Sequence, residues 1–251
     1  MQMQKFSSVL LSVFCFGAIA AQAQNQPEYY QTPPPNAPPP PGYNQSQTPS
    51  RSYYYWPEGA GPYVRGGVGP SFFEDGNINT FGGPVSGKVK FRPGLAADAA
   101  VGFAWNDFLA TDIEIGFIGA RIKDSVPGFS SDNSYLYHAP FLANVILSLP
   151  IPHSNVVPYV GIGGGGSEVV FDTDSFGDGA DTVTGRENDV VWAWQAFAGV
   201  RFKMNDHISF GVGYKYFATE DSSFSYPPDN FKVGFDGART HSVLFTVQVI
   251  F

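Results

Sequence analysis

The sequence of 251 residues has few charged side chains and no long apolar run beyond its N-terminal segment. Charged residues make up 14% of the chain, whereas a typical globular protein contains about 25%. A helix that crosses a membrane needs about 20 consecutive, mostly apolar residues. The low charge argues against an ordinary soluble domain, and the absence of long apolar runs excludes a bundle of transmembrane helices.

Cysteine is nearly absent, since Cys15 is the only one in the chain. It lies in a short apolar run, residues 9–20, which is followed by an Ala-Gln-Ala sequence at 21–23. This pattern predicts a secretory signal peptide over residues 1–23. Phe14 is too large for the position before a lipidated cysteine, so we do not expect Cys15 to be lipidated. The mature protein would then contain no cysteine, no disulfide and no thiol chemistry.

Basic residues are scarce, with 14 lysines and arginines against 22 aspartates and glutamates and a net charge of −8. Loss of Lys5 with the signal peptide would leave 13 basic residues and a net charge of −9. This balance disfavours nucleic acid as a partner. Divalent cations could link an acidic surface to anionic lipopolysaccharide, although composition does not establish that contact.

Proline is concentrated in a low-complexity segment, residues 24–60, and runs 33–35 and 38–41 consist of proline alone. Such runs favour polyproline II. A segment of this composition cannot form a core, so we expect a disordered or semi-rigid arm. It is either a simple spacer or a periplasmic arm whose tyrosines contact peptidoglycan or another partner.

The rest of the chain, residues 61–251, alternates between apolar and small or polar residues with a period of two. Aromatic residues reach 16% and glycines number 29. The last segment has Val243, Phe245, Val247, Val249 and Phe251 on one face. Seven earlier segments alternate in the same way, at 63–73, 94–105, 109–118, 137–148, 157–169, 192–202 and 208–217. The pattern predicts an all-β fold, an eight-stranded antiparallel transmembrane β-barrel.

The connections between these segments alternate in length. Short ones lie near 106–107, 150–155 and 204–207, and long ones at 74–89, 122–134, 172–189 and 219–239. Outer-membrane barrels have short periplasmic turns and longer extracellular loops. With eight strands, both termini lie on the short-turn side. We therefore expect the protein in the bacterial outer membrane with its Pro-rich arm in the periplasm.

A soluble barrel of the lipocalin type is the main alternative, because it also alternates, with its apolar face turned inward. Its outer face would have to be rich in charge. Here the less apolar face consists mostly of glycine, alanine, serine and threonine. That composition makes a poor water-facing surface but fits a narrow interior.

Four segments carry a family resemblance: PYVRGGVGPSF, VVPYVGIGGGG, WAWQAFAGVRF and HSVLFTVQVIF, the last ending on Phe251. Together they resemble the OmpA-like, opacity-type outer-membrane β-barrel family over residues 62–251. The resemblance implies a monomeric barrel, inserted by the outer-membrane assembly machinery, which reads the C-terminal strand and its Phe251. The segments end on this residue, so we expect the peptidoglycan-binding domain of OmpA itself to be missing and wall contact to fall to the arm.

The less apolar faces, assigned to the lumen, contain an equal number of cations and anions. The cations are Arg65, Arg201 and Lys215, and the anions are Asp98, Asp112 and Glu114. Buried charges must pair or be hydrated. We therefore expect an interior filled by ion pairs and by hydrogen bonds with His138, Asn144, Gln195 and Gln248. A narrow gated conduit for small solutes or ions is the alternative, whereas a wide pore does not fit eight strands.

The sequence favours no catalytic site, although some eight-stranded barrels act on lipid A. His241 and Ser242 are adjacent in a strand and point to opposite faces, so they cannot form a His–Ser pair. His138 lies on the inner face, where we expect a hydrogen-bonded structural role. His153 and His207 fall in short turns. The preferred function is non-catalytic, either envelope integrity or adhesion through the long loops.

No metal or cofactor site is predicted either. The long connection 172–189 is acidic, but Phe176 occupies a ligand position of the calcium-binding pattern, so we expect only loose cation attraction. The glycine run 163–166 lacks the lysine and the helix of a phosphate-binding loop. Its glycines more plausibly leave room for large side chains across the lumen.

Overall fold

The computed structural model describes residues 60–81, 84–124, 130–132, 134–177, 182–226 and 231–251. The predicted signal peptide and the Pro-rich arm as far as residue 59 lie outside the described residues. The described residues belong to one compact unit. Within them, no helix is long and apolar enough to span a membrane.

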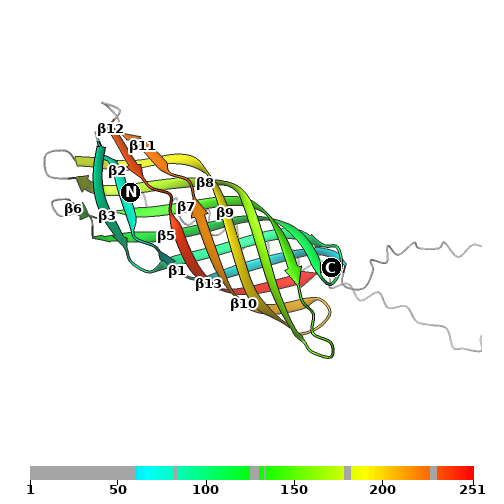
Figure 1. Ribbon diagram of the computed structural model, residues 1–251. Coiled ribbons are helices and arrows are strands. Elements are labelled where there is room, and N and C mark those ends of the chain that lie inside the picture. The colour runs from blue at the N-terminus through cyan, green and yellow to red at the C-terminus, as the bar shows by residue number, and fades with distance from the viewer. Residues whose placement is uncertain (1–59, 82–83, 125–129, 133, 178–181, 227–230) are drawn as a thin grey trace, which may run out of the picture. The chain divides into compact units, whose positions relative to one another are not determined.

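Among the described residues, eight strands form a closed antiparallel barrel (Figure 1). They are β1 (Gly61–Phe73), β4 (Gly94–Ala104), β5 (Leu109–Asp124), β7 (Tyr135–Ser148), β8 (Val156–Gly177), β9 (Thr182–Lys203), β10 (Ile208–Thr219) and β13 (Arg239–Ile250). Each pairs with the next, and β13 closes on β1 with Val249 opposite Val64. The predicted eight-stranded barrel is confirmed.

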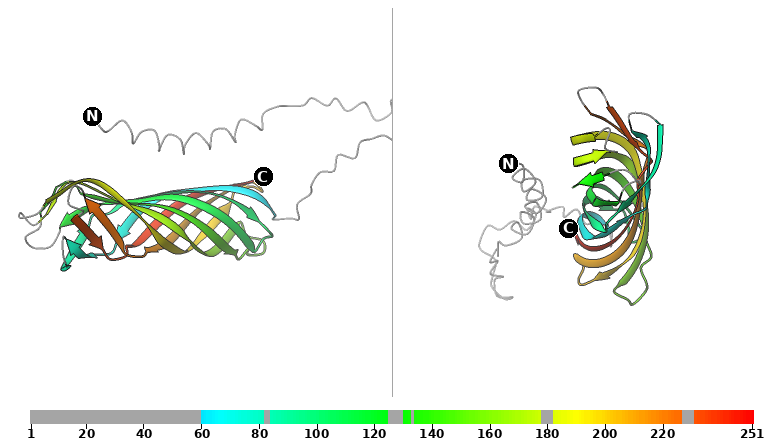
Figure 2. Two further views of the ribbon diagram at one scale, coloured as in Figure 1. Left: turned by 90° about the horizontal axis from the view of Figure 1, so that it is seen from above. Right: turned by 90° about the vertical axis from the view of Figure 1, so that its left-hand side faces the viewer.

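Five shorter strands lie in the long connections. They are β2 (Gly76–Phe81), β3 (Pro84–Phe91), β6 (Ser130–Asp132), β11 (Ser222–Tyr226) and β12 (Phe231–Phe235). β2 pairs with β3 and β12, β11 pairs with β12, and β6 pairs with β8. Figure 2 shows these strands at the end of the barrel opposite the C-terminus. We call this the long-loop end and the opposite end the short-turn end.

The predicted long connection 172–189 contains more strand than expected. β8 extends to Gly177 and β9 begins at Thr182, and the two strands pair over this part of the chain. The alternation of the barrel strands continues there, since Phe171 and Thr173 are buried and Asp174 is exposed. Gly185, opposite Thr173, has a φ of 119°. A glycine adopts this conformation without the steric cost that a side chain would add.

The outer wall of the barrel carries an apolar belt. Val101, Ile162 and Phe245 each leave more than 60% of their surface exposed, and they belong to three different barrel strands. Water-facing residues of this size would be costly in such numbers, whereas an apolar solvent favours them. Tyr159 does not belong to this belt: it lies inside the barrel, on the inward face of β8 together with Gly161.

The interior is packed in layers, which β7 shows in order. Leu136 belongs to an apolar core at the long-loop end, formed mainly by Ile78, Phe81, Val89, Ile122, Val169, Phe171, Val191, Phe224, Tyr226, Val233 and Phe235. We call it the mouth core. Leu142 belongs to an upper apolar layer with Ala96, Ile118, Ala193, Phe217 and Leu244. Asn144 lies at the level of the buried charges, and Ile146 belongs to a lower apolar layer with Tyr63, Ala104, Ala110 and Phe197.

Glycines of β8 make this packing possible. A Cβ atom on Gly161 would overlap the ring of Phe197, and one on Gly163 would overlap the side-chain amide of Asn144. Because these positions face the lumen, any larger residue would displace the side chains that fill it.

Candidate functional site

Arg65 on β1 lies at the centre of a cluster of buried charges. Its Nη2 is 3.1 Å from Asp112 Oδ2 and 2.9 Å from Glu114 Oε2. Its Nη1 is 3.3 Å from Asp98 Oδ1. Only 10% of the Arg65 side chain is exposed, and the three carboxylates are more deeply buried. These are charge-assisted bonds in a region with little water, where removal of one partner leaves a buried charge uncompensated.

Lys215 on β10, which β13 separates from β1, joins the same cluster. Its Nζ lies 2.5 Å from Asp98 Oδ2 and 2.6 Å from Glu114 Oε1. Asp98 and Glu114 thus each bridge the lysine and the arginine. Asp98 lies on β4 and Glu114 on β5, and neither strand pairs with β10. The ion pairs of Lys215 therefore connect strands that are far apart around the wall. We call these five residues the charge network.

Two amides extend the charge network across the lumen. Asn144 Nδ2 donates to Asp112 Oδ1 at 2.6 Å and to Glu114 Oε2 at 3.1 Å. Its Oδ1 accepts a 2.8 Å hydrogen bond from Gln195 Nε2. Both amides are almost completely buried. Strands β5, β7 and β9 are therefore connected through side chains inside the barrel.

Arg201 does not belong to the charge network. Within the described part of the chain it contacts no carboxylate. Instead it donates to Ser148 Oγ and, at 2.5 Å, to Gln248 Oε1. Its guanidinium carbon lies 5.1 Å from the centroid of the Tyr159 ring. The predicted balance of three cations and three anions is thus divided: the charge network holds two cations and three carboxylates, and Arg201 lies nearer the short-turn end.

The expectation that His138 forms hydrogen bonds is wrong. The side chain is 1% exposed, and neither ring nitrogen has a hydrogen-bond partner among the described residues. The reason is its height in the barrel, where its neighbours are the rings of Phe73 and Phe217, each with its centroid 5.7 Å away. The hydroxyls of Ser71 and Thr240 are likewise buried without a partner.

Two tyrosines in the interior were not among the predicted residues. Tyr63 donates a 2.9 Å hydrogen bond to Asp112 Oδ2, and Tyr159 packs on Arg201 and on Phe197. Strict alternation could have found both, because Tyr63 is two residues from Arg65 and Tyr159 is two residues from Gly161.

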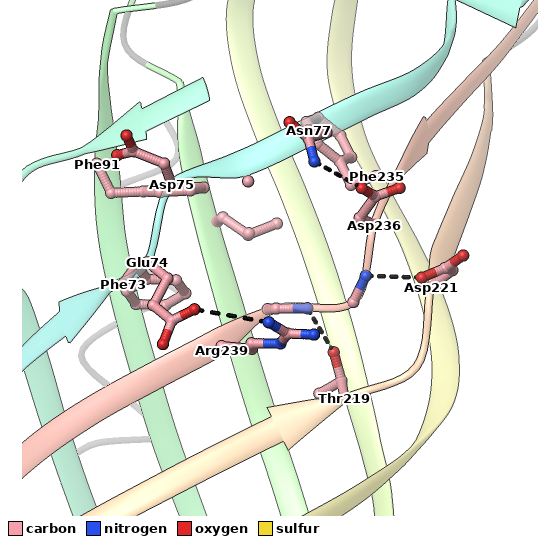
Figure 3. Close-up of a pocket in the computed structure, with 14 residues that line it drawn as sticks. Phe73, Glu74, Asp75, Asn77, Phe91, Thr219, Asp221, Phe235, Asp236 and Arg239 are labelled. Atoms are coloured by element: carbon pink, nitrogen blue, oxygen red, sulfur yellow. Dashed lines mark hydrogen bonds and ion pairs between the residues drawn. The ribbon is translucent and has the colours of Figure 1, made fainter. Parts of the chain in front are cut away.

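A pocket of about 370 Å³ opens at the long-loop end, beside the mouth core (Figure 3). Its apolar lining comes from Phe73, Phe91, Leu136 and Phe235, and its carboxylates are Glu74, Asp75, Asp221 and Asp236. Most of the carboxylates already have partners. Asp236 accepts from the amides of Asn77 and Asn79 at 2.9 and 3.1 Å, and Asp221 accepts from the Gly237 amide. These bonds fix the turn between β12 and β13.

A hydrogen-bonded chain runs along the outside of the barrel next to this pocket. The Tyr214 hydroxyl lies 2.6 Å from His241 Nδ1, and His241 Nε2 lies 2.8 Å from Glu74 Oε1. Ser242, the neighbour of His241, is buried on the other face. The separation of His241 from Ser242 follows from the strand geometry. This row of hydrogen bonds can hold or pass a proton, but it brings no serine nucleophile to His241.

Within the described part of the chain, no group of three or more histidine, cysteine, aspartate or glutamate side chains gathers to hold a metal ion. Asp178 and Asp181 of the acidic connection lie outside the described residues. The predicted terminal signal residue, Phe251, is half exposed at the short-turn end, and its amide donates to Pro62 O at 3.0 Å.

Comparison with known proteins shows a family, relatives and solved structures that are similar to this chain. The family described as outer membrane protein beta-barrel domain matches residues 52–251. An uncharacterized protein of Brucella suis biovar 1 is 24% identical over 197 residues, which cover 70% of this chain. The chain spans only 64% of the length of that relative.

Two solved structures are similar to this chain. The outer membrane protein OprG from Pseudomonas aeruginosa has a TM-score of 0.54 and 14% identity, and the match covers 77% of this chain and 98% of OprG. The Neisserial surface protein A gives a TM-score of 0.48 and 18% identity, over 77% of this chain and all of that protein. At these identities the likeness to OprG concerns the fold.

Proposed function

Since the chain belongs to the family of outer membrane protein beta-barrel domains, we propose that it is a sealed, non-catalytic barrel that acts through its outer surface. Surface interaction is the favoured role. Any such barrel also supports the integrity of the envelope. The proposal rests on one observation, the continuous filling of the interior by the mouth core, the charge network and the two apolar layers.

Because the interior is filled, the long-loop end is the surface that would bind a partner. β2, β3, β11 and β12 pair with one another over the mouth core, in which Phe171, Phe224 and Ile78 are fully buried. Burial raises the pKa of the Tyr226 hydroxyl above its usual range, so this side chain stays neutral in the core. A surface built on a packed core is held in one conformation, and a preorganised surface loses less entropy when it binds.

The orientation follows from the family's architecture, in which short turns face the periplasm and longer connections face outward. The long-loop end would then face the outside, and the Pro-rich arm would start in the periplasm, where peptidoglycan or a periplasmic partner is within reach. The β-barrel assembly machinery would read β13 with its terminal Phe251. A monomer is sufficient for these roles.

The surface role is tested with a deletion strain complemented by the wild-type chain or by Ser223→Glu/Ser225→Glu/Lys232→Glu. These three residues are exposed on β11 and β12. The proposal predicts that the variant folds and excludes a hydrophobic dye as well as the wild type does, but no longer supports attachment to epithelial-cell monolayers. Attachment equal to that of the wild type, or equal in the deletion strain, would contradict the surface role.

A narrow proton or water conduit is the second candidate. The observation in its favour is the group of buried polar atoms without partners on His138, Ser71 and Thr240, between the mouth core and the charge network. Vesicles that contain the protein and an internal pH-sensitive dye test this function. A conduit predicts proton flux that His138→Phe lowers, whereas a sealed barrel predicts flux no greater than that of protein-free vesicles.

A further inference from the structure

Five cations lie together on the outer wall at the long-loop end, although the chain as a whole is acidic. They are Lys88, Lys90 and Arg92, at the end of β3 and just after it, and Arg121 and Lys123 of β5. All five are exposed. The two segments, KVKFR and RIKD, contain five cations and one carboxylate, that of Asp124. We call this group of five the basic ridge.

The pairing of β3 with β5 brings the two segments side by side. Phe91 is opposite Ile122, and the Arg92 amide donates to Arg121 O at 2.9 Å. Val89 and Ile122 are buried in the mouth core. Because successive residues of a strand point to opposite faces, the cations on either side of these two face outward. The basic ridge is therefore a continuous patch on one face of the wall.

Three of the five cations of the basic ridge have no ion-pair partner among the residues that the structure describes. No hydrogen bond or ion pair joins the side chain of Lys88, Lys90 or Arg92 to another residue of the described chain. Arg121 lies over the ring of Tyr135, with 5.7 Å from its guanidinium carbon to the ring centroid. This is a cation–π contact, which holds the guanidinium on the outer side of the wall.

The basic ridge lies directly beyond the aromatic edge of the apolar belt. The ring centroids of Phe117 and Tyr137 are 5.6 Å apart, and the Tyr135 and Tyr137 rings stack at 5.8 Å. Aromatic girdles mark the boundary between hydrocarbon and headgroups in outer-membrane barrels. Arg121 follows Phe117 by four residues on β5, roughly 13 Å along the strand. The cations therefore lie at the height of the lipid headgroups.

We propose that the basic ridge binds the phosphate groups of an anionic glycolipid in the outer leaflet. Arg92 and Arg121 supply planar guanidinium groups, which bind phosphate oxygens in pairs, and the three lysines supply mobile point charges. The position beside the apolar belt favours a lipid over a soluble polyanion, because the acyl chains can pack on the belt while the phosphates meet the cations.

The test uses the full mature chain in nanodiscs of neutral lipid, titrated with diphosphorylated lipid A and with its dephosphorylated form. Each cation next to an anionic surface strengthens binding about fivefold, so Lys88→Gln/Lys90→Gln should weaken binding of the diphosphorylated form about 25-fold. The matched control is Lys203→Gln/Arg239→Gln, which removes two exposed cations elsewhere and should leave binding unchanged. Arg92→Lys keeps the charge and should cost several-fold through loss of the paired bonds.

A heat-dependent shift in gel mobility confirms that every variant is folded before binding is measured. The proposal is overturned if the matched control loses as much affinity as the ridge variant, because the effect would then be one of overall charge. It is also overturned if both lipid forms bind equally, or if inorganic phosphate or DNA displaces the lipid at similar concentrations, since the ridge would then be a site for soluble anions.

Discussion

Replacement of Arg65 by methionine removes the cation that contacts all three carboxylates of the charge network. The network holds two cations and three carboxylates, so the change leaves Lys215 alone with three buried negative charges. Breaking a buried ion pair by removing one partner costs about 3 to 5 kcal/mol. We expect Arg65→Met to lower the free energy of unfolding by that amount.

The measurement is urea unfolding in lipid vesicles, followed by tryptophan fluorescence and by gel mobility of the folded form. Arg201→Met is the matched control, since Arg201 contacts only neutral partners, and we expect a smaller loss, about 1.5 to 3 kcal/mol. In Arg65→Met/Asp112→Asn one carboxylate is neutralised as well. The net charge of the cluster returns to its original value, and about half of the stability should return.

The reasoning would be refuted if Arg65→Met unfolds at the same urea concentration as the wild type, or if Arg201→Met costs more. It would also be refuted if the double variant is less stable than the single variant. In that case the carboxylates would not be the groups that Arg65 stabilises.

Other parts of the structure make further predictions. Gly163→Val should prevent folding because its side chain would overlap the buried amide beside it, whereas Gly166→Val, with no atom within 4 Å of the added Cβ, should fold; gel mobility distinguishes them. Phe245→Arg, on the outer wall near the middle of β13, should cost about 2 to 4 kcal/mol, and Val190→Arg, near the belt's edge, about 0 to 1 kcal/mol in urea unfolding. Phe171→Ala should cost about 3 to 5 kcal/mol through a cavity in the mouth core. Overexpression of the wild type should leave the mass spectrum of lipid A unchanged, and a lost or added acyl chain would contradict the non-catalytic assignment.

The barrel strands could be predicted from the sequence because a wall between two different environments imposes a period of two. Val243 to Phe251 show this without interruption, and the structure confirms their outward face. The same rule places Arg65, Asp112 and Lys215 in the lumen. Alternation fixes which face a residue occupies, but it does not fix the height at which residues on different strands meet.

The height of a residue along the barrel axis explains where the interior differs from the prediction. The register of β9 against β10 and β8 sets Arg201 nearer the short-turn end than the carboxylates with which the sequence grouped it. His138 points into the lumen as expected, but its neighbours at that height in the barrel are the rings of Phe73 and Phe217. The mouth core was not predicted, because many of its residues lie on short strands within the long connections. These strands are interrupted by glycine and proline and pair across long sequence separations.

Single-channel recording in planar lipid bilayers tests the sealed interior most directly. The account predicts that the purified wild-type barrel, inserted at defined protein density, gives no stable conductance above that of the bare membrane. Stable, reproducible channels that disappear in Glu114→Ala or Arg201→Ala would contradict it, because the lumen charges would then line a path for ions.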